Sequence, residues 1–353
     1  MSKKDFRKES DSMGELKVPS QAKWGAQTQR AIENFQISDI RVSSKFISAL
    51  GLVKWSAAST NEELGLLDKE KSTAIKTAAQ DIINGKYDSQ FPVDIFQTGS
   101  GTSSNMNANE VIANIASLAS KQKIHPNDDV NMCHSSNDVI PTTINIAVSI
   151  SIEEELLPSI DSLIKSLSSK SNELKNTVKT GRTHLMDAMP ITMGQEIDGW
   201  KQQIKNAYNR IEGGIERLSQ LAQGGTAVGT GVNAHQDFGK IFVSKLSKKT
   251  GRHFKLSASY FESLSSQDTS LEISSYLRSL AVSLLKISND LRWMNSGPLS
   301  GIGEIKLPEL QPGSSIMPGK VNPVIPEAVA MASAQVIGND TTVSIAAQSG
   351  NFQ

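Results

Sequence analysis

A loop rich in proline and glycine, residues 312–327, gathers several kinds of side chain that can do chemistry. Its hydroxyls, cation, amide and carboxylate come from Ser314, Ser315, Lys320, Asn322 and Glu327. Proline fixes φ and glycine opens left-handed conformations, so the loop can be stiff in some places and mobile in others. A solvated turn is the ordinary interpretation of one such loop. The other polar loops of the chain favour a functional site instead.

Three further loops carry short polar side chains, at residues 98–107, 125–137 and 181–184. Each is expected at the end of a helix or at a break between helices, where free backbone N–H groups bind anions. Hydroxyls and amides dominate the four loops, as in Thr98, Ser100, Thr102, Ser135, Ser136, Asn137, Thr183 and Asn322. Such donors can surround a small carboxylate, so the four loops together predict an anion-binding site.

Composition limits the classes of function. The 353 residues include 36 basic and 36 acidic side chains, so the net charge is zero and neither nucleic-acid nor membrane-surface binding is indicated. Cys133 is the single cysteine, which excludes an intrachain disulfide and favours a reducing compartment. No signal-peptide region or transmembrane run is apparent, so a cytoplasmic protein is expected. His235 and His253 lack acidic or cysteine partners at metal-ligand spacing, so neither a metal nor another cofactor is expected.

Apolar residues recur at helical spacing through most of the chain. This pattern predicts helices over 45–64, 69–84, 109–120, 156–174, 200–222 and 267–295, and another from about residue 327. Helices of this length pack side by side as a bundle, and strands are expected to be minor. The sequence therefore predicts a mainly α protein: a mixed, mostly helical N-terminal domain over 1–138, then a long-helix bundle over 139–353. No stop signal precedes Gln353, so the chain is expected to end within a helix and to be truncated.

The loop motifs resemble those of the fumarase/aspartase superfamily. Gly-Ser-Ser-Ile-Met-Pro-Gly-Lys-Val-Asn over 313–322 is similar to the defining loop of that superfamily. The other similar blocks, in order, are 99–107, 109–114, 135–138, 181–184 and 224–231, and the resemblance extends from about Gly14 to Gln353. It implies a homotetramer whose central bundles assemble and whose active sites are each shared by three chains. The resemblance also leads us to expect that the small C-terminal helical domain of the superfamily is missing after Gln353.

Three features resemble class II fumarate hydratase rather than aspartate ammonia-lyase. They are His184 after Arg-Thr, His125 at the start of His-Pro-Asn-Asp, and Ser-Gly-Asn-Phe at 349–352. Asn-Pro-Val-Ile-Pro-Glu at 322–327 and Asp-Thr-Thr at 340–342 are more similar to the ammonia-lyase. The resemblance implies reversible hydration of fumarate to L-malate, by anti elimination and addition through a carbanion. Ammonia elimination from aspartate and a non-catalytic helical scaffold are the alternatives.

The resemblance also implies roles for individual residues. Ser314 would be the base, with its alkoxide form favoured by Lys320. His184, paired with Glu327, would orient the water that adds to fumarate or protonate the departing hydroxyl. Lys320 and Asn322 would hold the carboxylate on which charge accumulates. The rest of the dicarboxylate would contact Ser100, Thr102, Ser135, Ser136, Asn137 and Thr183. These assignments agree with what the chemistry needs, a base over the C–H bond and donors aimed at the adjacent carboxylate.

A second anion site is implied at His125, Asn127 and Asp128, and a network that only staples this loop is the alternative. His134 stands where the superfamily usually has glutamine, and Met132 replaces a common lysine. The glycine-rich stretch 224–231 is not followed by Gly-Lys-Ser/Thr, so it predicts a backbone-rich loop near the site rather than a phosphate loop.

Overall fold

The computed structural model describes residues 6–317 and 319–353. Its contacts divide the chain into two compact units. The first contains the described residues up to Ser151, together with Glu216–Gln267 and Gly350–Gln353; the second contains Ile152–Ile215 and Asp268–Ser349. These contact-based units do not test where one folding domain ends and the next begins, so the domain boundary predicted after residue 138 stays a prediction. The compact units are divided differently, because the whole of helix α5 (Ser136–Ser151) belongs to the first unit.

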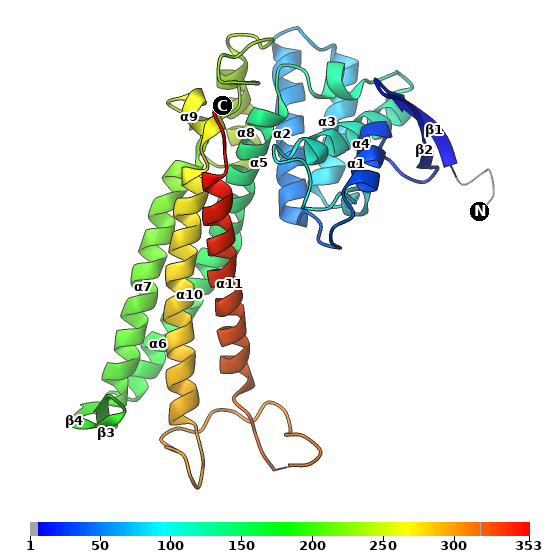
Figure 1. Cartoon of the computed structure of the whole chain (residues 1–353). Coiled ribbons are helices and arrows are strands. Elements are labelled where there is room, and N and C mark those ends of the chain that lie inside the picture. The colour runs from blue at the N-terminus through cyan, green and yellow to red at the C-terminus, as the bar shows by residue number, and fades with distance from the viewer. Residues whose placement is uncertain (1–5, 318) are drawn as a thin grey trace. The chain divides into compact units, whose positions relative to one another are not determined.

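The first unit is a helical core with a small hairpin and short connecting elements (Figure 1). Its helices are α1 (Ala26–Asn34), α2 (Ser44–Glu63), α3 (Lys69–Ile83), α4 (Thr102–Ser120), α5, α8 (Phe238–Thr250) and α9 (Tyr260–Ser265). Short turns η1 (Asp88–Gln90) and η2 (Pro126–Val130) join them. Strands β1 (Phe6–Asp11) and β2 (Gly14–Pro19) are antiparallel, and β5 (Gln220–Leu221) pairs in parallel with β6 (Lys255–Leu256).

Local sequence explains why α2 and α3 form and pack. The Ser43 and Asp68 side chains accept hydrogen bonds from the N–H groups of Phe46 and Lys71, which caps the two N-termini. Both predicted helices, 45–64 and 69–84, are confirmed. At Gly51, a Cβ atom would lie 2.9 Å from Ile83 Cγ1, so this glycine lets the two helices approach closely.

The second unit is built on long helices. It contains η3 (Ile152–Leu156), α6 (Leu157–Glu173), the antiparallel strands β3 (Val178–Thr183) and β4 (Met186–Thr192), most of α7 (Met193–Leu218), α10 (Asp268–Met294) and α11 (Val324–Gln348). Helices α7, α10 and α11 have 26, 27 and 25 residues, or about 40 Å each at 1.5 Å per residue. Helices α10 and α11 lie side by side (Figure 1). The long helices predicted from the apolar spacing are confirmed.

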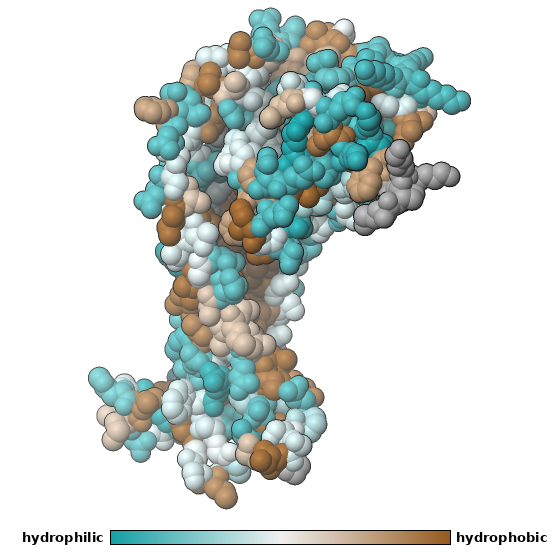
Figure 2. Space-filling view, turned by 45° about the vertical axis from the view of Figure 1, so that its right-hand side comes forward, coloured by the Kyte–Doolittle hydropathy of each residue, from teal (hydrophilic) through white to brown (hydrophobic). Residues whose placement is uncertain are grey.

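A glycine also lies where α7 faces α10. A Cβ atom at Gly214 would lie 2.4 Å from Ile273 Cδ1, so a larger residue there would require the Ile273 side chain to shift. The apolar stripe of α7 is buried at Trp200, Ile204 and Ile211. Other apolar side chains of the long helices stay on the surface, among them Val282, Ile325, Met331 and Ile345. Figure 2 shows hydrophobic side chains exposed along these helices.

Three expectations from the sequence need correction. Helix α4 begins at Thr102 rather than at 109, because Gly101 adopts a left-handed φ of 70° and lets the polar residues that follow start the helix. Residues 181–184 belong to a β-hairpin rather than a simple turn. Helix α11 ends at Gln348, so the expectation that the chain ends within a helix is wrong. No helix in the described residues combines the length and apolar character that crossing a bilayer requires.

Candidate active site

The residues predicted to form the site divide into two groups, one in each compact unit. The first unit holds Ser100, Thr102, Ser135, Ser136 and Asn137, together with His125, Asn127 and Asp128. The second unit holds Thr183, His184, Ser314, Lys320, Asn322 and Glu327.

The start of α4 fixes Ser100 and Thr102. The two hydroxyls are 2.7 Å apart and share a hydrogen bond. Gln97 Oε1 accepts hydrogen bonds from both the N–H and the hydroxyl of Ser104, which caps the helix in place of an N-cap side chain. At Gly101 a Cβ atom would lie 2.9 Å from Ile140 Cγ1 on α5, so glycine allows the starts of the two helices to meet.

The start of α5 carries the next three predicted residues. The Ser135 hydroxyl accepts from the Asn137 N–H at 3.3 Å, and the Ser136 hydroxyl accepts from Asn105 Nδ2 at 2.9 Å. Asn137 Nδ2 donates to the Ala227 carbonyl at 2.6 Å. Each side chain is therefore held by neighbours in the same unit, and this short segment lies at a helix N-terminus, where anions are favoured.

Asp138 ties this segment to the glycine-rich stretch 224–231. Its Oδ1 accepts from the Ser135 N–H at 2.9 Å, and its Oδ2 accepts from the N–H groups of Gly224 and Thr226 at 3.1 and 3.0 Å. Burial raises the pKa of Asp138 to about 7, against the opposing effect of these three N–H donors. The backbone-rich loop predicted at 224–231 thus lies beside the predicted site residues of α5.

A buried polar cluster lies next to the start of α5. It was not identified from the sequence. Lys54 Nζ donates to Asn131 Oδ1 and to His134 Nε2, both at 2.9 Å. Asn131 Oδ1 also accepts from Asn105 Nδ2 at 3.2 Å and from Asn109 Nδ2 at 3.1 Å. The cluster is linked to the Ser136 hydroxyl through Asn105.

The cluster leaves its histidine neutral. Burial and then the Lys54 charge lower the pKa of His134 well below its ordinary value. Burial also lowers the pKa of Lys54 well below its ordinary value, although the Asp138 carboxylate opposes the shift. Because His134 Nε2 accepts a hydrogen bond from Lys54, the imidazole proton belongs on Nδ1. Lys54 was no local signal for this cluster, because the 45–64 segment also carries other polar residues, among them Lys45, Ser48 and Glu62.

The residues of the implied second anion site lie together at the start of η2. His125 Nδ1 accepts from the N–H groups of Asn127 and Asp128 at 3.3 and 3.1 Å. Asp128 Oδ2 lies 3.2 Å from the same nitrogen. The His125 side chain therefore caps the start of this turn. These contacts are those of the loop-stapling alternative, and the anion site stays a prediction.

In the second unit, Thr183 and His184 lie at the tip of the β3–β4 hairpin. Both side chains are exposed, and His184 and Leu185 turn the chain with φ values of 57° and 61°. A bulge between Thr180 and Arg182 precedes them, and a Cβ atom at Gly181 would lie 2.7 Å from the Met189 carbonyl. The bulge and the glycine bring the strands close and direct the tip outward.

An open cleft of about 1150 Å³ contains Lys320, Asn322 and Glu327. It lies between the end of α10, the start of α11 and the loop of residues 295–323 that joins them. Ser314 is exposed on the same loop. At Gly313 a Cβ atom would lie 2.1 Å from the Lys320 carbonyl, so glycine is required where the two arms of this loop meet.

Some pairings implied by the resemblance are not formed within the described part of this chain. No hydrogen bond or ion pair there joins His184 to Glu327 or Lys320 to Ser314, so both pairings stay predictions. No group of three or more metal-binding side chains occurs among the described residues either, and the expected lack of a metal also stays a prediction.

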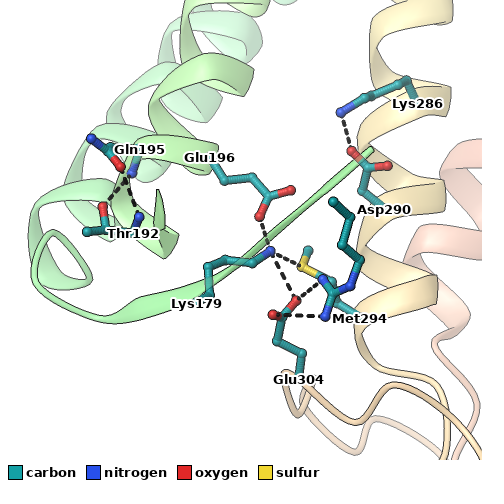
Figure 3. A network of polar contacts seen from close by, with 9 residues as sticks. Lys179, Thr192, Gln195, Glu196, Lys286, Asp290, Met294 and Glu304 are labelled. Atoms are coloured by element: carbon teal, nitrogen blue, oxygen red, sulfur yellow. Dashed lines mark hydrogen bonds and ion pairs between the residues drawn. The ribbon is translucent and has the colours of Figure 1, made fainter. Parts of the chain in front are cut away.

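A network of buried charges connects the hairpin to the 295–323 loop (Figure 3). Glu304 of the loop pairs with Lys179 and Arg182 of β3, and Lys179 also pairs with Glu196 of α7. The sequence reasoning missed this network, because Glu304 is distant in the chain from Lys179, Arg182 and Glu196 and no local pattern pairs them.

Comparison with known proteins identifies the family of the chain. Residues 14–338 match the family model described as lyase. The chain is 57% identical to "Fumarate hydratase class II" of Xylella fastidiosa (strain 9a5c) over 348 residues, which cover 99% of this chain and 74% of that protein. It is 52% identical to the protein of the same name from Mycobacterium tuberculosis (strain H37Rv) over 350 residues, with coverage of 99% and 74%.

Solved structures show the same likeness. The recombinant class II fumarase from Schistosoma mansoni superposes with a TM-score of 0.96 at 37% identity, covering 98% of this chain and 77% of that one. The fumarate lyase:delta crystallin from Brucella melitensis bound to cobalt gives a TM-score of 0.94 at 44% identity, with coverage of 99% and 77%. The chain belongs to the class II fumarate hydratase family. The family resemblance and the helical-bundle fold expected from the sequence are confirmed.

Proposed function

We propose that this protein is a hydro-lyase that converts fumarate and water to L-malate and back. The observation that carries the proposal is the 57% identity to a class II fumarate hydratase over 99% of the chain. The cleft that gathers Lys320, Asn322 and Glu327 supports it, because a cation and an amide beside a carboxylate suit a small dianionic substrate.

Dehydration of malate requires removal of a C–H proton beside a carboxylate, which then takes up extra negative charge. In the proposed mechanism the Ser314 alkoxide takes this proton and becomes a hydroxyl. A serine hydroxyl is intrinsically a weak base, so its deprotonation depends on an electropositive setting, to which Lys320 contributes. Lys320 and Asn322 stabilise the carboxylate of the carbanion intermediate.

The hydroxyl leaves from the opposite face of the substrate. His184, oriented by Glu327, gives it a proton, and the C–O bond breaks to release water and fumarate. Hydration reverses the steps, with His184 accepting a proton from the attacking water. Histidine suits this role because its ordinary pKa lies near neutrality.

The remaining predicted residues hold the dicarboxylate. In the proposed site its oxygens accept hydrogen bonds from the hydroxyls and amide of Ser100, Thr102, Ser135, Ser136, Asn137 and Thr183. Ser135, Ser136 and Asn137 are at the N-terminus of α5, which adds a favourable dipole for an anion.

We also propose a homotetramer in which each active site combines loops from three chains. The apolar side chains exposed along the long helices support an assembly through these helices. The exposure of His184 and Ser314, with no partner for His184 at Glu327 in the described chain, supports sharing between chains. The proposal includes a second anion site at His125, Asn127 and Asp128, and a cytoplasmic location in keeping with the single Cys133.

Ultraviolet absorbance of fumarate tests the function. The purified protein is given L-malate and, separately, L-aspartate. We expect absorbance to rise with malate and to stay flat with aspartate. A rise with aspartate alone would assign the ammonia-lyase activity, and no rise with either substrate would leave a non-catalytic scaffold.

Mixing two inactive variants tests the sharing of sites. Asn137→Ala and His184→Asn protein are unfolded together, refolded, and assayed with malate. If the two residues of one site come from different chains, some sites in mixed tetramers escape both substitutions and activity returns. Activity no higher than that of either variant alone would contradict the shared site.

A further inference from the structure

We infer that Glu304 is a positioning residue that ties the hairpin carrying Thr183 and His184 to the loop carrying Ser314 and Lys320. The inference rests on the proposed function, since it assigns Glu304 a part in that reaction. Glu304 lines the same cleft as Lys320 and Asn322, and its carboxylate oxygens contact Arg182 and Lys179.

The Glu304 carboxylate contacts two residues of strand β3, Arg182 and Lys179. Its Oε2 accepts from Arg182 Nη1 at 3.0 Å and its Oε1 from Arg182 Nη2 at 3.3 Å. Lys179 Nζ lies 3.0 Å from Oε2. A two-pronged arginine–carboxylate pair fixes direction as well as distance, which a single contact would not do. Figure 3 shows Lys179 and Glu304 converging between the hairpin and the loop.

Lys179 also contacts residues at the ends of two long helices. Lys179 also forms an ion pair with Glu196 near the start of α7 and lies 3.5 Å from Met294 Sδ at the end of α10. Two positive and two negative side chains therefore balance one another, and Glu304 is the member supplied by the loop.

Burial strengthens the electrostatic attraction within these ion pairs. The side chains of Lys179 and Glu304 are 6% and 15% exposed, so water screens them little. Burial alone would raise the pKa of Glu304, but hydrogen bonds from Arg182 and Lys179 outweigh it and hold the pKa below the ordinary value. Glu304 is therefore ionised near neutral pH, and its removal would leave Lys179 and Arg182 facing Glu196 with excess positive charge.

Glu304 stands at the point where the loop leaves the rest of the unit. The N–H groups of Glu304 and Ile305 donate to the Met294 carbonyl at 2.8 and 3.2 Å, and the Leu307 N–H donates to Asn295 Oδ1 at 2.8 Å. Beyond Leu307, the hydrogen bonds of the described loop residues stay within the loop, as between Met317 N–H and the Ser314 carbonyl. The Glu304 side chain is thus the last described polar link from this loop to the hairpin.

The position of Arg182 relates this link to the proposed chemistry. Arg182 immediately precedes Thr183 and His184 in the hairpin. The residue that donates two hydrogen bonds to Glu304 therefore also helps to fix the position of Thr183 and His184. A shift of about 1 Å in a reacting group can cost about 100-fold in rate. Loosening this link is therefore expected to lower turnover without changing the helices.

The test compares Glu304→Gln with Glu309→Gln. Both replace a carboxylate by an amide on the same loop, but Glu309 is 57% exposed and pairs with Lys306, which is 83% exposed. We expect kcat for malate to fall by about tenfold to 100-fold in Glu304→Gln, with a smaller change in KM, and to stay within about twofold in Glu309→Gln. Glu304→Asp keeps the charge and is expected to recover part of the loss.

Limited trypsin digestion gives a readout that does not depend on activity. Loosening of the loop is expected to speed cleavage after Lys306 and Lys320 in Glu304→Gln but not in Glu309→Gln. Faster cleavage would support the link even if the wild-type protein acted on neither malate nor fumarate, which would defeat the proposed function alone. Wild-type kcat together with wild-type cleavage would overturn the inference. Loss of the helical circular-dichroism signal in Glu304→Gln would overturn it too, by making Glu304 a residue needed for folding.

Discussion

The two groups of site residues differ in how their own unit supports them. Ser135, Ser136 and Asn137 are held by hydrogen bonds to neighbours in the first unit, above a buried cluster of lysine, histidine and asparagine side chains. His184 and Ser314 are exposed on a hairpin and a loop of the second unit. These two segments are joined by the contacts of Glu304 with Lys179 and Arg182.

This difference matches the roles proposed for the two groups. Residues that bind a fixed carboxylate gain from being rigid before the substrate arrives, because no free energy is then spent in ordering them. Residues that move protons must reach the substrate from its two opposite faces. Here His184 and Ser314 lie on exposed segments that a substrate can approach. Substitutions in the first group are therefore expected to change stability and binding, and those in the second group to change turnover.

The largest expected effect is on turnover in the second group. His184→Asn and Ser314→Ala should each lower kcat for malate by about 100-fold or more, the usual contribution of a positioned acid or base. Because both side chains are exposed, circular dichroism and the urea midpoint should not change. His253→Asn, which alters another exposed histidine, serves as the control and should keep wild-type activity. Unchanged turnover in His184→Asn would remove this residue from the mechanism.

The next effect is on the stability of the buried cluster that supports the first group. Asn131→Leu removes the oxygen that accepts from Lys54, Asn105 and Asn109, and leaves buried donors without a partner. We expect the free energy of unfolding to fall by about 3 kcal/mol, measured by urea titration. Gln202→Leu, which also removes a side-chain amide but on an exposed helix face, should change it by less than about 0.5 kcal/mol. Equal effects of the two substitutions would contradict the importance of the buried cluster.

The smallest effect is a pH dependence of the same cluster. Burial and Lys54 keep the pKa of His134 well below the unfolded value of about 6.5. As pH falls below about 6.5, the unfolded chain binds a proton that the folded chain does not, so stability falls by up to about 1.4 kcal/mol per pH unit. His134→Gln removes this proton uptake, and its stability should fall less steeply between pH 6.5 and the folded pKa. Urea titrations across this range compare the slopes, and parallel slopes would contradict a neutral, buried His134.

The sequence predicted the elements whose signals are local. Apolar spacing was sufficient for α2, α3 and α10, and the loop motifs were sufficient for the family. The start of α4 was missed because Ser, Asn and Thr residues usually favour loops, whereas here Gly101 and Gln97 start a helix among them. The hairpin at 178–192 was missed because its strands are short and largely exposed, so no alternation of apolar residues marks them.

The support around the site could not be predicted, because it depends on contacts between distant parts of the chain. Lys54 meets His134, and Glu304 meets Arg182, only after folding. Single charged residues at these positions look in sequence like ordinary surface residues. The motif residues themselves were visible because several stand together in short segments.

A crystal structure with bound L-malate or fumarate tests the central claim most directly. The account predicts one ligand whose carboxylates contact Ser135, Ser136 or Asn137 on one side and Lys320 or Asn322 on the other, with Ser314 and His184 on opposite faces of its central carbons. A ligand bound only to one of the two groups, or away from Ser314 and His184, would contradict it.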